Sequence, residues 1–390
     1  MSHILEFSVE DLAGRTAPYH NTLQRDLNIF FGNNGSGKTS LMKILHSALD
    51  GDAAILENVP FTKAEVKIFS VTYDRTFTRT ITKAAEPEAP ATQTEEELVG
   101  VLGGTTENKT KMEWKTSPKE PKISSLAHVY LPISRLYKNT EDNGPLRVGG
   151  KVYYTGVGTS TYSEEELDRR FAESLTLSWR NYSADVSKAV RQAQQKGLAN
   201  ILRAVLSESS KRGKKRTADT SHAYRRVSSF LAREPGFADV LGSKEDFLEK
   251  YQRDATLRDV VKDIEEVERS IEIATAPRER LRELISSMYA GGKGIVFSDN
   301  EIEVHLKNGK AIGLPYLSSG EKQILYILVE TLLSNVNSIL IDEPEISMHI
   351  DWQKTLVKSM RSLNPRAQII LATHSPEIMA DVPDGKIFRL

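Results

Sequence analysis

The 390-residue sequence contains no cysteine, and this absence alone excludes several classes of protein. Disulfide frameworks, thiolate zinc sites, iron–sulfur clusters and cysteine nucleophiles all require that residue. An excess of charge of one sign is missing too, because 52 lysines and arginines stand against 53 aspartates and glutamates. The sequence therefore excludes a protein that coats nucleic acid through global positive charge, but it leaves room for a local basic patch.

Long apolar runs are also missing. No stretch approaches the roughly 18–20 apolar residues that a membrane span requires. The first seven residues lack the basic start and the apolar segment of a signal peptide. We therefore expect a cytoplasmic protein without a membrane partner. With 39% apolar and 27% charged residues the chain can bury a sizeable core, which excludes extensive disorder.

The pattern of apolar residues divides the chain into three segments. Strand and helix signals alternate over residues 1–162 and again over residues 291–390. Between them, apolar side chains in residues 163–290 recur every three or four positions, which predicts helices, one of them ending at Pro277. At about 1.5 Å per residue this segment is long enough for a short arm or a compact lobe. We predict one α/β domain that is split by a helical insertion.

A glycine-rich loop lies near the start of the first segment. Residues 32–39 read Gly-Asn-Asn-Gly-Ser-Gly-Lys-Thr and match the pattern GxxxxGK[ST], with a strand signal before them and a helix signal after them. Glycines let backbone N–H groups close on phosphate oxygens, and the start of the helix adds positive partial charge. We expect Lys38 to contact the β- and γ-phosphates of ATP, and the Thr39 hydroxyl to bind Mg²⁺. The alternative is a glycine-rich turn without a ligand. The expected nucleotide-binding residues are Asn33, Asn34, Gly35, Ser36, Gly37, Lys38, Thr39 and Ser40.

Two carboxylates end an apolar strand signal at residues 339–343. We expect Asp342 to join the Mg²⁺ shell and Glu343 to orient and deprotonate an attacking water. The alternative is an acidic pair that caps the next helix. His374 follows another apolar strand signal. Its two interpretations are a structural histidine and a catalytic side chain that contacts the γ-phosphate.

A helix start is predicted within residues 317–323, which read Leu-Ser-Ser-Gly-Glu-Lys-Gln. Ser318 with Glu321 three positions later predicts a capping box. A helix N-terminus with two serines and a glycine is also suited to an anion. The two interpretations are compatible.

In this order, the four motifs resemble those of ABC-type ATPase heads of the RecF, SMC and overcoming-lysogenisation-defect (OLD) group. In the resemblance, residues 32–39 correspond to Walker A, residues 317–323 to the ABC signature with Ser319 in place of its first glycine, Asp342 and Glu343 to Walker B and the catalytic glutamate, residues 345–349 to the D-loop, and His374 to the switch histidine. The acidic sequence that begins at Asp342 is most similar to stand-alone bacterial ATPases of DNA repair and anti-phage defence. No glutamine matches the Q-loop, although Arg135 lies near the corresponding position.

The resemblance implies a P-loop NTPase fold, that of an ABC head split by a helical insertion, with slow hydrolysis of ATP in the presence of Mg²⁺. In such families the signature contacts the ATP that a second head binds, so Ser318, Ser319 and Gly320 are expected to complete the site of a second copy. A homodimer is therefore implied, with a larger oligomer as a further option.

We expect the switch to regulate a nucleic-acid-linked process or a separate effector, such as a nuclease or toxin. The sequence shows no carboxylate cluster for cutting DNA, so we expect no intrinsic nuclease activity. One alternative is a non-hydrolysing ATP-dependent sensor or scaffold that holds a partner protein. Another is a transporter ATPase subunit, which the long interval between Thr39 and Leu317 disfavours.

A basic run lies inside the helical segment, at Lys211, Arg212, Lys214, Lys215 and Arg216. It is either a solvated loop or a contact for a nucleic-acid backbone or an acidic partner. No aromatic residues alternate with it, so sequence-specific recognition of nucleic acid is not expected. Trp179 and Trp352 occupy apolar helical positions and are expected in the core.

Overall fold

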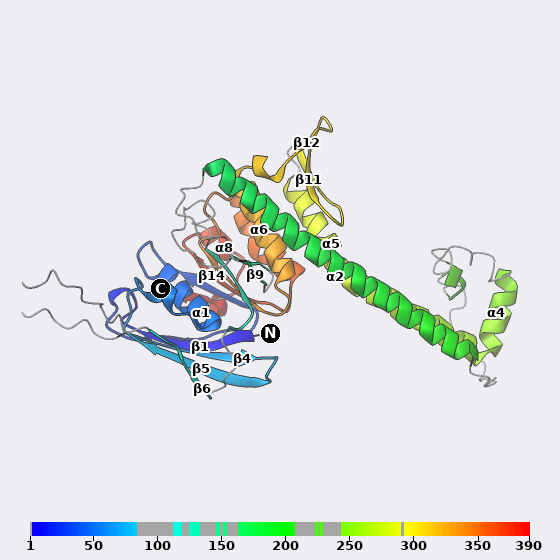
Figure 1. The fold of residues 1–390 in the computed structure, drawn as a ribbon, viewed down its shortest axis with the longest axis horizontal. Coiled ribbons are helices and arrows are strands. Elements are labelled where there is room, and N and C mark those ends of the chain that lie inside the picture. The colour runs from blue at the N-terminus through cyan, green and yellow to red at the C-terminus, as the bar shows by residue number, and fades with distance from the viewer. Residues whose placement is uncertain are drawn as a thin grey trace, which may run out of the picture. The chain divides into compact units, whose positions relative to one another are not determined.

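A computed structural model of the chain contains two compact units (Figure 1). The structure describes residues 2–83, 112–118, 125–132, 146–148, 151–153, 163–206, 223–225, 227–228, 243–289 and 292–390. Unit 1 comprises Met1–Ser178, Leu284–Val296 and Glu303–Leu390, and unit 2 comprises Trp179–Glu283 and Phe297–Ile302. The first unit therefore joins the two ends of the sequence.

An antiparallel sheet in unit 1 has the strand order β2-β1-β4-β5-β6. Its strands are β1 (Ser2–Glu10), β2 (Tyr19–Thr22), β4 (Lys63–Ser70), β5 (Arg75–Thr82) and β6 (Lys115–Ser117). Side chains alternate between a buried and a more exposed face, and Phe7, Val9 and Val66 lie on the buried one. This alternation is typical of an antiparallel sheet that covers a core with one face.

A parallel sheet in the same unit has the order β15-β3-β14-β13-β7. The strands are β3 (Leu27–Phe31), β7 (His128–Pro132), β13 (Ser338–Asp342), β14 (Gln368–Thr373) and β15 (Ile387–Arg389), and all neighbouring pairs are parallel. Every residue of β13 and β14 is buried, which explains their unbroken apolar runs. Because carboxyl ends of parallel strands share one edge, the loops after β3, β13 and β14 leave the sheet together.

Helix α1 (Lys38–Asp50) joins the two sheets into one core. Its buried residues Leu41 and Leu45 belong to the same apolar cluster as Phe7 of β1 and Leu340 of β13. Three further helices of unit 1 are α6 (Ser319–Leu333), α7 (Ile350–Leu363) and α8 (Pro376–Met379). The core therefore holds the loop before α1 rigidly at the edge of the parallel sheet.

The chain also contains two small sheets and several 3₁₀ turns. A three-stranded sheet contains β10 (Lys293–Phe297), β11 (Ile302–Leu306) and β12 (Ala311–Ile312), and β8 (Leu146–Val148) pairs with β9 (Lys151–Tyr153). Single 3₁₀ turns lie at Leu12–Gly14, Ala54–Leu56, Leu314–Tyr316 and Asp384–Lys386. The turn that ends at Tyr316 directly precedes α6.

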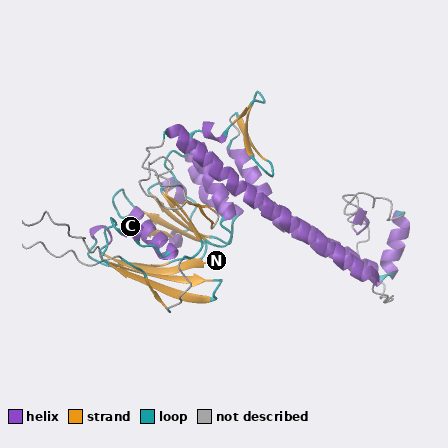
Figure 2. Cartoon of the chain, viewed as in Figure 1, coloured by secondary structure: helices purple, strands orange, loops and turns teal. Residues whose placement is uncertain are grey.

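Unit 2 is mainly helical (Figure 2). Two long helices, α2 (Glu164–Leu206) and α5 (Ala255–Met288), continue into it from unit 1, and α4 (Lys244–Arg253) precedes α5. The two long helices approach closely at Gly197, where an added Cβ would lie 2.2 Å from a methyl group of Val267. Trp179 is fully buried, and its Nε1 donates to the Ser298 carbonyl at 2.7 Å.

These observations confirm the predicted α/β class with a helical segment between the two ends of the chain. The expectation that Pro277 ends a helix is wrong, because α5 runs through it. The loss of one backbone hydrogen bond at a proline is tolerated where flanking side chains such as Leu281 are buried. The predicted domain boundaries at residues 163 and 290 stay a prediction. The boundary between the two compact units of the structure falls inside α2, after Ser178.

Two sequence-based interpretations concern residues outside the described part of the chain. The basic residues Lys211, Arg212, Lys214, Lys215 and Arg216 lie there, and so does Arg135. Within the described ranges, no helix is both long and apolar enough to cross a membrane.

Candidate active site

The loop between β3 and α1 depends on its glycines. Gly35 and Gly37 have φ angles of +84° and +97°, in the left-handed region that glycine adopts without strain. A Cβ on Gly37 would also approach the Ala13 side chain to 3.0 Å. The loop therefore has a backbone shape that most other residues would disturb, as a phosphate-binding loop requires.

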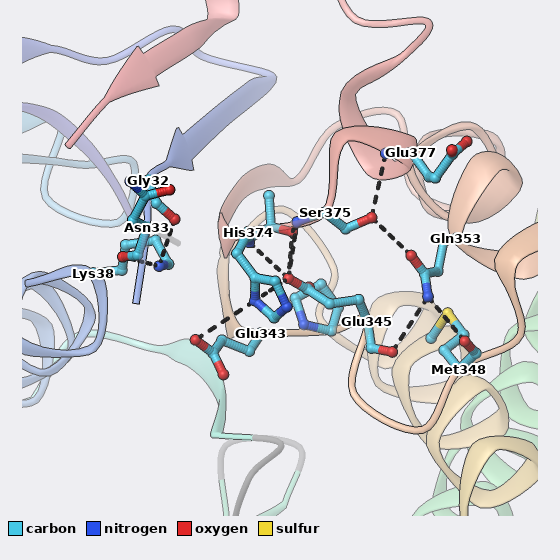
Figure 3. Close-up of polar contacts among 12 residues, drawn as sticks. Gly32, Asn33, Lys38, Glu343, Glu345, Met348, Gln353, His374, Ser375 and Glu377 are labelled. Atoms are coloured by element: carbon cyan, nitrogen blue, oxygen red, sulfur yellow. Dashed lines mark hydrogen bonds and ion pairs between the residues drawn. The ribbon is translucent and has the colours of Figure 1, made fainter. Parts of the chain in front are cut away.

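Lys38 closes this loop from within (Figure 3). Its side chain is only 3% exposed, and its Nζ donates to the carbonyls of Gly32 at 2.8 Å and Asn33 at 3.0 Å. The ammonium group is thus desolvated and held by neutral oxygens. Electrostatic attraction to an anion is strong in such a place, because little water screens it.

Asp342, the last residue of β13, meets the start of α1. The Thr39 side chain interacts with its carboxylate, while the buried Oδ1 has no hydrogen-bond partner among the described residues. Burial raises the pKa of Asp342 to about 6, and the charges of Glu343 and Glu345 act in the same direction. The Thr39 interaction and the Lys38 charge partly offset this effect.

This arrangement passes a simple test for a divalent cation. Mg²⁺ prefers oxygen ligands, and here a hydroxyl lies beside a carboxylate that has one unpartnered buried oxygen. A cation would also offset the negative charge that three neighbouring acidic side chains concentrate. Thr39 and Asp342, which are far apart in the sequence, therefore form a donor set that fits Mg²⁺.

Glu343 follows Asp342 with a left-handed backbone. Its φ is +49°, which is uncommon for a residue with a side chain, and its N–H donates to the Ala372 carbonyl at 2.8 Å. The carboxylate faces His374, whose Nδ1 lies 3.9 Å from Glu343 Oε1 (Figure 3). The loops after β13 and β14 thus bring the two predicted catalytic side chains together.

A third carboxylate, Glu345, holds the histidine more closely. Its Oε1 lies 2.9 Å from His374 Nδ1 and accepts the backbone N–H of His374 at 2.7 Å. Sequence reasoning assigned Glu345 only to the D-loop and missed this role. The signal was a third acidic residue two positions after the Walker B pair, but a loop has no periodicity that would show which way its side chain points.

The predicted signature forms a separate part of unit 1. Ser318 caps α6 by accepting the Glu321 N–H at 3.3 Å, and Glu321 Oε2 accepts the Ser318 N–H at 2.7 Å, which confirms the capping box. Gly320 packs directly against the D-loop, because an added Cβ would lie 2.2 Å from the Ser347 carbonyl oxygen. Ser319, the replacement for a glycine, is exposed.

A groove of about 570 Å³ opens beside the start of α6. It is lined by Met288, Ser318, Gly320, Glu321, Ser347, Met348, His349, Asp351 and Trp352. None of these belongs to the loop at residues 32–39, so the signature and the phosphate loop do not share one pocket. The expectation that Trp352 is a core residue is wrong. It is half-buried at the groove and stacks on Tyr289, with ring centroids 5.8 Å apart.

The structure therefore brings the predicted phosphate-loop and catalytic residues to one edge of the parallel sheet. Residues of the predicted signature line a separate groove. Residues 33–40 lead into or begin α1, whose Thr39 interacts with Asp342, and Glu343 and His374 stand at the same edge of the sheet. Pro132, the last residue of β7, pairs with Asp342.

Two curated bacterial proteins are similar to part of this chain. Over 95 residues the chain is 32% identical to "Retron Vc95 probable ATPase" of Vibrio cholerae. This match covers 21% of this chain and 18% of that protein. Over 105 residues it is 33% identical to "Septu protein PtuA" of Bacillus thuringiensis, covering 23% and 26%. The chain thus matches about a fifth to a quarter of the length of these relatives.

Solved structures of SMC heads are also similar to this chain. An SMC head domain with an extended coiled coil from Pyrococcus furiosus shares 14% identity, with a TM-score of 0.44 and coverage of 98% of this chain and 92% of that one. A head with coiled coil and joint from Pyrococcus yayanosii shares 12% identity, with a TM-score of 0.45 and coverage of 100% and 95%.

A match to a protein family covers more than half of the chain. It extends over residues 138–380, which include Ser318, Asp342, Glu343 and His374 but not the phosphate loop. The chain belongs to the family described as "AAA domain, putative AbiEii toxin, Type IV TA system".

Proposed function

We propose that this chain is a Mg²⁺-dependent ATPase of a bacterial defence system that hydrolyses ATP slowly, after two copies pair around the nucleotide. The observation that carries the proposal is the interaction of Thr39 with Asp342, whose buried Oδ1 has no hydrogen-bond partner among the described residues. It joins the phosphate loop to the acidic strand end in the way that a nucleotide–metal site requires.

The phosphate loop binds the nucleotide in this proposal. Backbone N–H groups of residues 33–40 surround the phosphates, and Lys38 leaves its carbonyl partners to pair with the β- and γ-phosphates. Thr39 and Asp342 hold Mg²⁺, which when bound neutralises phosphate charge. Glu343 accepts a proton from the attacking water, and His374 contacts the γ-phosphate.

Pairing completes the site because the signature faces away from the chain's own phosphate loop. Ser318, Ser319 and Gly320 contact the nucleotide that the second copy binds. Apolar side chains next to these residues support an interface, since Tyr316 is 76% exposed and Ile346 and Ile350 are exposed as well. Larger assemblies built from such pairs are compatible with this arrangement.

The relatives suggest what the ATPase controls. Retron and Septu proteins are named among them, so we assign the paired state to control of a separate effector protein such as a nuclease or toxin. The chain itself is assigned no nuclease activity. Nucleic acid is a possible ligand of Lys211, Arg212, Lys214, Lys215 and Arg216.

A single-turnover ATPase assay combined with light scattering tests the proposal. The wild-type chain should convert ATP to ADP, and Glu343→Gln should retain ATP and accumulate as pairs, because the proton acceptor is lost while Asp342 and Thr39 remain. Glu377→Gln is the matched control, since its carboxylate lies on α8, away from His374 (Figure 3). Unchanged turnover in Glu343→Gln would remove the role assigned to Glu343. Wild-type pairs that form without hydrolysis would favour the non-hydrolysing scaffold instead.

A further inference from the structure

Glu345 is a buried acidic side chain at the centre of the loop that carries His374. It is 6% exposed, and its Oε1 accepts the Thr373 hydroxyl at 2.7 Å and the backbone N–H groups of His374 at 2.7 Å and Ser375 at 3.2 Å. The same oxygen lies 2.9 Å from His374 Nδ1 (Figure 3). One carboxylate oxygen therefore holds both the backbone and the imidazole of the histidine.

Glu345 is itself held in place by Gln353 of α7. The Gln353 amide donates to the Met348 carbonyl at 2.9 Å, and its Oε1 accepts the Ser375 hydroxyl at 2.7 Å. These contacts tie both sides of the Glu345 loop to α7. The carboxylate thus has a fixed position under His374, as a residue that orients another side chain requires.

Two carboxylates compete for one nitrogen of His374. Nδ1 is 2.9 Å from Glu345 Oε1, within hydrogen-bond range, and 3.9 Å from Glu343 Oε1, which is too far for a hydrogen bond. A ring N–H donates well to only one of them. The structure therefore leaves the Glu343 carboxylate without a hydrogen bond from the imidazole.

We propose that Glu345 is a positioning residue for hydrolysis. It accepts the Nδ1 proton of His374 and thereby sets the tautomer and the direction of the ring. It also keeps His374 from bonding to Glu343, so that Glu343 stays available to accept the proton from water. The inference rests on the proposed ATPase function and deepens it.

The first test compares Glu345→Gln with the matched control Glu377→Gln in steady-state ATP turnover. The glutamine keeps the size of the side chain and one acceptor oxygen, but it removes the charge that favours Nδ1–H. We expect kcat to fall roughly 10- to 100-fold, in the range of a misplaced acid–base group, while KM for ATP stays within about threefold. The control should keep its kcat.

A double-mutant cycle separates positioning from general structural support. In the His374→Ala background, Glu345→Gln should change kcat by less than about twofold, because the residue that it orients is gone. An equal loss of kcat in both backgrounds overturns the inference. So does unchanged turnover in Glu345→Gln, provided that Glu343→Gln is impaired. If Glu343→Gln also keeps full turnover, the role assigned to Glu343 fails instead. If the wild type converts no ATP, the proposed ATPase function fails.

Nitrogen-15 NMR of the histidine rings tests the inference on the wild-type protein. The His374 resonance, assigned by its loss in His374→Ala, should show the proton on Nδ1. Observation of a neutral ring with the proton on Nε2 alone would contradict the proposed contact with Glu345, whatever the stability of the variants.

Discussion

The phosphate-loop half and the signature half of unit 1 differ in how complete they are. In the first, Lys38 is buried and bonded to its own loop, and Thr39 interacts with Asp342. In the second, Ser318 and Gly320 line an open groove beside the exposed Tyr316. One half is assembled within a single chain, whereas the other presents its residues outward.

This difference indicates an order of events. In the proposed function, the assembled half takes up nucleotide in a single copy, because its glycine loop and its acidic strand end already meet. In the same proposal, the signature residues of the open half contact nucleotide only when a second copy binds. Variants in the two halves should therefore have separable effects on nucleotide binding and on pairing.

The largest effect is expected from Lys38→Ala, in the assembled half. Loss of a buried ammonium group from the phosphate site should weaken ATP binding roughly 100- to 1000-fold, or about 3–4 kcal/mol. Isothermal titration calorimetry measures this, with Lys354→Ala on α7 as the control. Full ATP affinity in Lys38→Ala would contradict the assignment of nucleotide binding to the phosphate-loop half.

Ser318→Arg should affect the open half alone. The long cationic side chain fills the groove beside Gly320, so ATP-dependent pairing should weaken about 30- to 100-fold, or 2–3 kcal/mol. The affinity of one copy for ATP should remain unchanged. Light scattering and calorimetry measure the two quantities. Ser318→Thr, which retains the helix cap, is the matched control and should pair normally.

Gly320→Ala tests the contact between the signature and the D-loop. The added methyl group would meet the Ser347 carbonyl oxygen, so α6 or the loop must shift. We expect unfolding to become easier by about 1–2 kcal/mol, with weaker pairing. Gly294→Ala is the control, because nothing lies within 4 Å of its added Cβ. Equal melting temperatures of the two variants in thermal unfolding would show that the contact is not tight.

A pH-dependent effect concerns Glu330 in α6, the helix of the open half. Burial raises its pKa to about 7 from 4.5, so the folded chain binds this proton more tightly than the unfolded chain. Stability from the protonated form is complete below pH 4.5 and is lost as the pH rises towards 7. Glu330→Gln should therefore match the wild type near pH 4.5 and exceed its stability by about 3 kcal/mol at pH 8. A constant difference across this range in thermal unfolding would contradict the assignment.

Much of the assembled half was accessible from the sequence because its signals are local. The glycine loop follows an apolar strand and precedes a helix, and Asp342 ends another apolar run, so each motif carries its own context. That Thr39 and Asp342 touch follows from strand order, which depends on contacts between distant segments. The resemblance to ABC heads supplied that order, and periodicity did not.

Other features depend on packing that no local pattern encodes. Trp352 has helical apolar spacing, yet it lies at the groove because Tyr289 offers it a ring to stack on. Proline is typical of a helix end, yet α5 continues through Pro277, where neighbouring side chains are buried. Glu345 shows its role only when the loop after β13 turns it beneath His374.

The strand order of the parallel sheet has a consequence for synthesis on the ribosome. β3, which presents the phosphate loop, lies between β14 and β15, two strands that follow it only after the helical segment and the signature. A nascent chain therefore carries the glycine loop for a long period without these neighbouring strands, and such non-local pairing forms late in folding. The phosphate loop reaches its final surroundings only after β14 and β15 have been translated.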